Sequence, residues 1–292
     1  MTTEIATLNS GNFAEMAKAM GMGADMAKAP SKSSTLPRLR IWNQAVMGQA
    51  EVKGKMKNME VVPAGMYRLQ MPDEKYVYAE QANIRVFVQR FMYKRYDSEN
   101  GQYVKTLMAE DLNGDLKDNT GGFNCGKPAG YIEDFQSLPD DTKALIKQIK
   151  RVRVLLGEVQ LINPVDEQGN EVTSESYPFI WEVENKDAFK TMGEPFTQLG
   201  RQKRLPVQHW IECGTEERSL PTGASFFLPT QKLDLSSTIE LTEGDQKRFQ
   251  DFVEWIGNYN QYIVNSYNDS AGKKISADDA SLVEEFIDID ED

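Results

Sequence analysis

The strongest strand signal in this chain is the segment Ile84-Arg-Val-Phe-Val-Gln-Arg-Phe-Met-Tyr-Lys-Arg-Tyr96. Alternate side chains of a β-strand point to opposite faces of its sheet. One face of this segment would carry aliphatic residues, namely Ile84, Val86, Val88 and Met92. The other would carry mainly cationic and aromatic residues, namely Arg85, Phe87, Gln89, Phe91, Tyr93 and Arg95. The pattern predicts a strand with one face in a core and the other against a partner.

The cationic and aromatic face has the properties that single-stranded nucleic acid requires. Bases stack on aromatic rings for about 1–3 kcal/mol each, and basic side chains neutralise phosphates without reading sequence. We therefore predict a groove for nucleic acid lined by Arg85, Phe87, Phe91, Tyr93 and Arg95. The alternative is a strand buried on both faces, with its arginine side chains snorkelling to the rim.

Basic clusters elsewhere would extend such a groove, although each can also be an ordinary solvated loop. They are Arg38 and Arg40, the lysines of residues 53–57, Lys127, Arg151 and Arg153, and Arg201, Lys203 and Arg204. Their number within an acidic protein favours a nucleic-acid partner.

The β pattern continues through a predicted body over residues 39–241. Residues 97–101 supply a hairpin turn between strands over 81–96 and 102–109. A second predicted hairpin joins a strand that begins near Val152 to one over 177–183. Further predicted segments are strands over 66–70, 207–213 and 225–228 and one helix over 140–150. Short strands separated by Gly, Pro and Asn favour a sandwich or a barrel.

The two ends of the chain differ from this body. Residues 1–38 predict a flexible arm with a short methionine-rich helix, which can dock on its own domain or mediate self-association. Thr242 and Asp245 form an N-terminal capping signal, and apolar residues then recur at helical spacing, so a helix is predicted over 242–268.

Residues 269–292 predict a disordered acidic tail. Residues 276–292 contain eight acids and no Lys or Arg, and without these acids the net charge of the chain would change from −12 to −4. A block of like charges repels itself and stays unpacked, so it predicts either an interaction tail or a solubility tail.

Groups typical of catalysis and metal binding are sparse. The chain has two cysteines, Cys125 and Cys213, and a single histidine, His209. On a strand, His209 and Cys213 would lie about 13 Å apart, too far to share one zinc ion. Residues 121–127 have the spacing of a phosphate loop, but Pro128 follows where that loop needs a hydroxyl for Mg²⁺. We expect no enzymatic activity, no metal and no cofactor.

No apolar run approaches the roughly 18 residues of a membrane span, and the first ten residues lack a signal-peptide pattern. We therefore expect a soluble cytoplasmic protein with no membrane partner.

The chain resembles phage-type single-stranded DNA-binding proteins in the order of its segments. These are an arm, a β-rich body, a C-terminal helix and an acidic tail that ends Phe286-Ile-Asp-Ile-Asp-Glu-Asp292. That family is built on the OB-fold, so the resemblance implies an OB-fold-like barrel or an elaborated β body with insertions. It also implies sequence-independent binding of single-stranded DNA in replication and recombination, in the host cytoplasm if the protein is viral, with homo-oligomers possible.

In that family the acidic tail competes with DNA for the basic groove and docks replication or recombination proteins. The resemblance assigns this role to Glu284, Glu285, Phe286, Asp288, Asp290, Glu291 and Asp292. Some members end on an aromatic residue, whereas Phe286 lies six residues before the end of this sequence. A tethered polyanion near a cationic groove is also an intramolecular competitor on physical grounds alone.

Two other classes of function stay open. A structural or assembly protein, of a virion or a scaffold, would bury the same aromatic residues and use the methionine-rich arm and the tail for protein contacts. An enzyme would need a carboxylate site that the sequence does not reveal. The sequence also leaves the choice between DNA and RNA open.

Overall fold

The structure is a computed structural model that describes residues 36–52, 55–130, 132–220, 223 and 225–287. Its strands are β1 (Arg38–Trp42), β2 (Val46–Val52), β3 (Lys55–Val62), β4 (Met66–Gln70), β5 (Tyr76–Ala79), β6 (Gln81–Asp97), β7 (Gln102–Lys105), β8 (Lys150–Ile162), β9 (Ser176–Val183), β10 (Ile211–Ser219) and β11 (Ser225–Leu233). Its helices are α2 (Asp140–Gln148), α3 (Lys186–Thr191), α4 (Glu194–Arg201) and α5 (Glu243–Ile287), with 3-10 turns at Asn124–Gly126 and Pro206–Gln208. The prediction of a mainly β fold with a C-terminal helix is confirmed.

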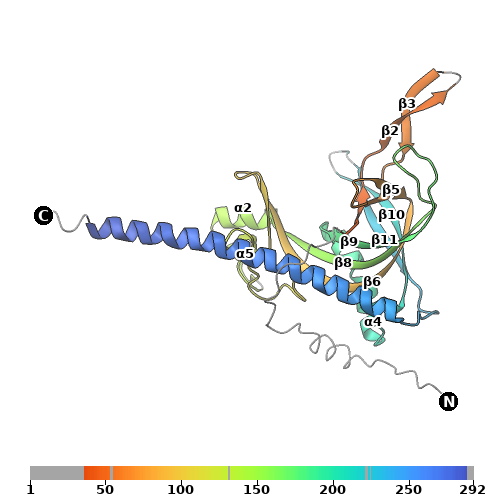
Figure 1. Ribbon diagram of the computed structural model, residues 1–292. Helices are drawn as coiled ribbons and strands as arrows, with labels where there is room; N and C mark the ends of the chain where they lie inside the picture. Colours follow the sequence, from red (N-terminus) through yellow and green to blue (C-terminus); the bar gives the residue numbers. More distant parts are fainter. Residues whose placement is uncertain (1–35, 53–54, 131, 221–222, 224, 288–292) are drawn as a thin grey trace, which may run out of the picture.

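One nine-stranded sheet forms the body, in the order β11-β10-β6-β8-β9-β1-β4-β5, with β7 paired to β6. Strands β2 and β3 form a separate hairpin that stands away from this sheet (Figure 1). Within the described residues the sheet does not close into a barrel, because its end strands β11 and β5 do not pair.

Side-chain hydrogen bonds nevertheless join the two halves of the curled sheet. The hydroxyl of Tyr67 on β4 donates to the Gly214 carbonyl on β10 at 2.9 Å. The hydroxyl of Thr215 donates to the Gly65 carbonyl at 2.8 Å, and the Phe227 amide donates to Asn43 at 2.9 Å. The body is therefore an open sheet whose two halves are joined by polar bridges.

Strand β6 is the centre of this sheet. It pairs antiparallel with β8 over most of its length, with β10 near its start and with β7 near its end. Both predicted hairpins, β6–β7 and β8–β9, are confirmed.

A β-bulge at Phe87 reverses the alternation of β6. The register with β8 shifts between Val86 and Val88. The strands approach closely here, since a Cβ on Gly157 would lie 2.0 Å from the Arg85 carbonyl oxygen. As a result, Ile84 and Val86 enter one core cluster, whereas Val88 enters a second cluster together with Phe87. The predicted single apolar face is therefore wrong, because a bulge adds one residue and flips the strand beyond it.

Helix α5 covers the second cluster. Phe252 packs edge-on against Phe87 with ring centroids 5.7 Å apart, and Ile256 joins the same cluster. The predicted capping signal is present: the Asp245 amide donates to the Thr242 hydroxyl, and the Thr242 amide donates to the Asp245 carboxylate. The N-terminus of α5 is thus set by its own sequence.

At its other end α5 is longer than predicted. It extends to Ile287, beyond the body in Figure 1, and so includes most of the segment predicted as a disordered tail. Residues 276–287 contain Ala, Leu and Glu and no Pro, and these residues favour a helix even where like charges oppose packing. The rest of the predicted tail, 288–292, and the predicted arm up to residue 35 lie outside the described residues.

Several elements of the body differ from the prediction. Helices α3 and α4 lie where only strands and loops were expected, and Arg201 ends α4 instead of opening a loop between strands. The strand predicted over 207–213 begins only at Ile211, after the turn Pro206–Gln208. No helix in the described part of the chain is long and apolar enough to cross a membrane.

Candidate nucleic-acid interface

Two of the predicted groove residues, Arg85 and Phe87, lie beneath α5. The Arg85 side chain is 7% exposed and donates to the Val207 carbonyl at 2.6 Å. Its Nη1 also donates to Asp245 at 2.7 Å and to Glu158 at 3.3 Å. The predicted exposure of both residues is wrong, because the first turns of α5 cover this part of β6.

Tyr93 and Arg95 lie farther along β6 and are also covered. Tyr93 is buried, and its hydroxyl donates to the Leu112 carbonyl at 3.2 Å. Burial raises the pKa of Tyr93. Arg95 lies 4.0 Å from Asp97, and the Lys127 ammonium lies 5.5 Å above the Tyr93 ring and donates to two carbonyls of its own loop. Tyr93 therefore has no free face for a base.

Phe91 is half-buried beside two of the predicted basic residues. It faces Arg153 across the β6–β8 ladder, and Tyr93 faces Arg151. The Phe91 ring lies 5.9 Å from the Phe189 ring on α3. The structure thus brings Phe91, Arg151 and Arg153 together, as the sequence predicts, but next to a helix that the sequence does not reveal.

The remaining predicted residues lie elsewhere. Arg201 and Lys203 are exposed at the end of α4, and Arg204 donates to the Leu235 carbonyl at 2.6 Å. Glu284, Glu285 and Phe286 belong to α5, whereas Asp288, Asp290, Glu291 and Asp292 lie outside the described residues, as does Lys53.

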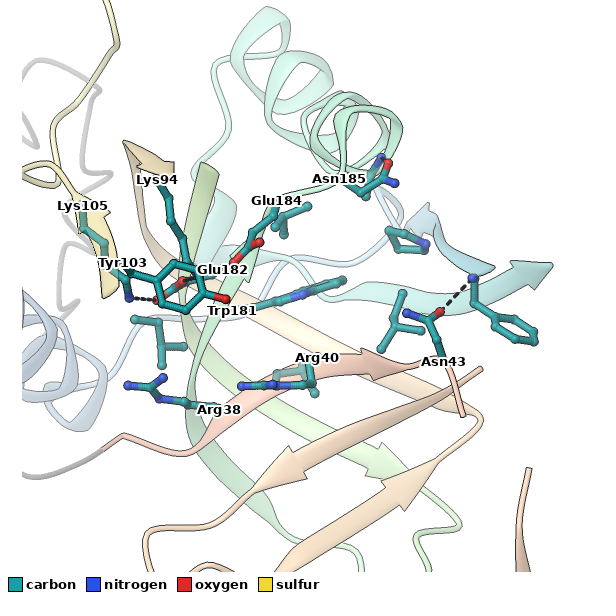
Figure 2. Close-up of a pocket in the computed structure, with 17 residues that line it drawn as sticks. Arg38, Arg40, Asn43, Lys94, Tyr103, Lys105, Trp181, Glu182, Glu184 and Asn185 are labelled. Carbon is teal, nitrogen blue, oxygen red and sulfur yellow. Dashed lines mark hydrogen bonds and ion pairs between the residues drawn. The ribbon is translucent and has the colours of Figure 1, made fainter. Parts of the chain in front are cut away.

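A cavity of about 550 Å³ opens between β1, β7 and β9 (Figure 2). We call it the arginine cavity. It exists because β1 pairs with β9 only at Arg38 and Ile180 and the two strands then diverge. Its polar and aromatic lining residues are Arg38, Arg40, Asn43, Lys94, Tyr103, Lys105, Trp181, Glu182, Glu184, Asn185 and Phe227.

Acidic side chains neutralise one side of this cavity. The Lys94 ammonium binds Glu182 at 2.9 Å and also binds Glu184, and Lys105 lies 3.6 Å from Glu182. Burial opposes the charge of Glu182, but Lys105 and Lys94 outweigh it and lower the pKa of that carboxyl. Burial likewise opposes the charge of Lys94, yet its acidic partners raise the pKa of Lys94. Lys94 and Lys105 therefore already have carboxylate partners.

Arg38 and Arg40 face this network from β1, and both are exposed (Figure 2). Among the described residues neither has a carboxylate within ion-pair distance. Partial burial lowers the pKa of Arg40, and the guanidinium groups of Arg68 and Arg38 lower it further. Glu182 and Glu184 attract Arg40 across the cavity and partly offset this lowering. The β1 side of the cavity therefore carries two positive charges that no ion pair in the described residues neutralises directly.

Aromatic rings flank the same cavity. Tyr103 is 52% exposed, packs edge-on against Tyr96 at 5.1 Å, and lies 4.8 Å from the Lys94 ammonium. Outside the cavity lining, Arg68 pairs with Arg40 across the β1–β4 ladder, and its guanidinium lies 3.5 Å from the Trp42 ring centroid and 4.6 Å from that of Tyr76. The cavity thus combines free cations with a tyrosine ring open to solvent.

The cysteines and the histidine form no shared site. Cys125 and Cys213 are buried free thiols, and burial raises the pKa of Cys125 to about 12 and also raises that of Cys213. His209 is buried with its Nδ1 3.1 Å from the Asp234 carbonyl. No group of three potential metal-ligating side chains occurs in the described part of the chain.

Comparison with known proteins adds no relative. No protein-family model matches the chain, and no curated protein or solved structure matches it either. Function is therefore inferred from the chemistry of the cavities alone.

Proposed function

We propose that this protein binds single-stranded nucleic acid, with DNA as the expected ligand, at the arginine cavity and without sequence preference. The observation that carries the proposal is the pair of exposed arginines, Arg38 and Arg40, which form no ion pair with any described carboxylate and which line the same cavity as the exposed ring of Tyr103. Phosphates require cations that are not already neutralised, and bases require a ring with a free face.

The local charge supports this proposal although the whole chain carries −12. The cavity is lined by four cationic side chains, Arg38, Arg40, Lys94 and Lys105, and by two acidic ones, Glu182 and Glu184. Lys94 and Lys105 are paired with the two carboxylates, so Arg38 and Arg40 are the cations available to bind phosphates. When they bind, they displace the counterions of the nucleic-acid strand. Contacts from guanidinium groups to phosphate oxygens carry no sequence information, so binding through such contacts would be independent of sequence.

The proposal includes a non-catalytic role in replication or recombination, on an OB-fold-like body. The polar bridges that join the two halves of the open sheet are compatible with such a body. The proposal also gives the acidic end of the chain, including Glu284 and Glu285, the role of a competitor for the arginine cavity that binds partner proteins once displaced. Because α5 carries these two residues beyond the body, this competition requires the end of the helix to bend or unwind toward the cavity.

A second candidate is a structural or assembly protein. Two observations favour it. Phe87 and Tyr93 are buried, as expected for an assembly protein, and Met47, Met56 and Met59 of the β2–β3 hairpin are all exposed. Methionine side chains adapt to irregular apolar partners, and exposed apolar patches mark contact sites.

Binding to a labelled oligo-dT, measured by fluorescence anisotropy over a range of salt concentrations, tests the proposal. We expect the logarithm of the association constant to fall linearly with that of the salt concentration, with a slope of about −0.7 for each phosphate neutralised. Two arginines that each bind one phosphate account for a slope of about −1.4. A duplex of equal length should bind more weakly, because its bases are not free to stack on Tyr103.

The absence of oligo-dT binding at low salt would reject the nucleic-acid proposal and favour the assembly protein. Equal binding of the duplex and the single strand would reject base stacking on Tyr103. It would leave phosphate binding by the two arginines in place.

A further inference from the structure

A second cavity, of about 470 Å³, lies on the other side of α3 from the arginine cavity. Helix α3 lines both: Ala188 faces the arginine cavity, and Phe189 faces the second one. The second cavity is lined by Arg151 and Arg153 of β8, by Lys186, Asp187, Phe189 and Lys190 of α3, and by Gly193, Glu194 and Thr197 at the start of α4.

Arg153 forms the inner wall of this cavity and is only 8% exposed. Its Nε donates to the Phe189 carbonyl at 3.1 Å, and its Nη1 donates to the Gln89 side chain at 2.6 Å. The guanidinium also lies 4.5 Å from the Phe189 ring centroid and 5.1 Å from that of Phe91. Neutral acceptors and aromatic rings thus hold the side chain in one orientation.

No carboxylate in the described part of the chain pairs with Arg153. Burial alone lowers the pKa of Arg153 to about 10. A buried cation without a counter-ion is costly, so a bound anion would be stabilised there. The third nitrogen, Nη2, approaches Gly193 so closely that a Cβ at that position would lie 2.4 Å from it.

The other charged groups make the cavity suitable for a dianion. Four cationic side chains line it, Arg151, Arg153, Lys186 and Lys190, against two acids, Asp187 and Glu194. Glu194 also accepts a hydrogen bond from Gln231 at 3.3 Å. The excess of two positive charges matches a phosphomonoester, which carries nearly two negative charges at neutral pH.

We propose that the second cavity binds a phosphomonoester, with Arg153 Nη2 and the ammonium groups of Lys186 and Lys190 contacting the phosphate oxygens. The phosphate would belong either to a free nucleotide or to the end of a nucleic-acid strand. This site does not depend on the arginine cavity, since the two cavities share no lining residue.

Isothermal titration of the full chain with inorganic phosphate, at an ionic strength fixed with chloride, tests this site. We expect binding by the native chain and a loss of at least about tenfold in affinity in Lys186→Ala/Lys190→Ala, since losing one hydrogen bond to a charged group costs about 1.5 kcal/mol or more. Both lysines are exposed, so the variant should fold. Gly193→Ala should weaken binding while every charge is kept, because its Cβ displaces Nη2.

The matched control is Lys75→Ala/Lys232→Ala, which removes two lysines whose side chains are each 78% exposed and which line neither cavity. It should bind phosphate like the native chain. Failure of the native chain to bind phosphate, or equal binding by all variants, would overturn the proposal.

Two further ligands distinguish the sources of the phosphate. Competition by dTMP for the phosphate site would identify a nucleotide site. Tighter binding of oligo-dT with a terminal phosphate than without one, lost in Lys186→Ala/Lys190→Ala, would identify a strand-end site. Oligo-dT without a terminal phosphate carries no phosphomonoester, so its binding tests the arginine cavity. Inorganic phosphate tests the second cavity, and one proposal can therefore be rejected while the other stands.

Discussion

Replacing Arg85 with methionine is expected to lower the free energy of unfolding by about 3–5 kcal/mol, because it breaks a buried ion pair from one side. The guanidinium joins β6 to the first turn of α5 through Asp245 and to β8 through Glu158. After the substitution Asp245 would lose its guanidinium partner, and of its two described arginine partners Glu158 would keep Arg248.

The pH dependence of stability provides a check on this ion pair. Burial opposes ionisation of Asp245, but hydrogen bonds from Arg85 and Thr242 outweigh it and hold the pKa of Asp245 below its usual value. The stabilisation is therefore complete above the unfolded pKa of about 3.9 and is lost as the pH falls through the lower folded pKa. We expect the difference between the native chain and Arg85→Met to shrink over that acidic range.

Urea denaturation of both proteins measures the effect. The control is Arg218→Met, which breaks an exposed pair with Glu216 and should cost less than about 1 kcal/mol. Adding Asp245→Asn to Arg85→Met should recover part of the loss, because it removes the unpaired buried charge. A loss in Arg85→Met no larger than in the control would contradict this account of how α5 is held.

The double variant Arg38→Ala/Arg40→Ala should weaken binding of oligo-dT by about a hundredfold. Each lost hydrogen bond from a charged group is worth about 1.5 kcal/mol, and about 1.4 kcal/mol corresponds to a factor of ten. The slope of the logarithm of affinity against that of salt concentration should become shallower by about 1.4. Both side chains are exposed, so the fold should be unaffected.

Anisotropy titrations of the native chain and the variant make this comparison. Lys75→Ala/Lys232→Ala again serves as the control, since it removes two positive charges outside both cavities. If the control loses as much affinity as the arginine variant, binding depends on overall charge and not on the arginine cavity.

The central hairpins could be predicted because their signals are local. The alternation of residues 81–96 and the glycine turn before β7 act within a few residues of chain, and β6, β7, β8 and β9 lie close to where these signals predict. The capping signal at Thr242 is local too, and α5 begins directly after it.

The orientation of β6 could not be predicted, because it depends on distant partners. The bulge at Phe87 lies opposite Gly157 on β8, and the α5 residues that cover Arg85 lie about 160 positions later. The sequence pattern of a strand with a cationic side chain is the same whether that side chain binds a phosphate or a buried carboxylate. The predicted groove was therefore misplaced at Arg85 and Phe87.

The candidate site was only partly visible in the sequence. Arg38 and Arg40 stand out as a basic pair, but nothing local distinguishes them from other basic clusters. They are distinguished by their place in the fold. Strand β1 pairs with β9 only at Arg38 and Ile180, and the arginine cavity lies where the two strands then separate. Tyr103 could have been found, since it lies opposite Tyr96 in the predicted hairpin, just as Lys105 lies opposite Lys94. Helices α3 and α4 are too short to produce a clear helical period.

Ultraviolet cross-linking of oligo-dT to the full chain, followed by mass spectrometry of the peptides, tests the central proposal most directly. We predict cross-links at Tyr103 and at residues of β1 that flank Arg38 and Arg40, and we predict that Arg38→Ala/Arg40→Ala removes them. Cross-links confined to the β2–β3 hairpin or to α5, or cross-links that persist unchanged in the double variant, would contradict binding at the arginine cavity.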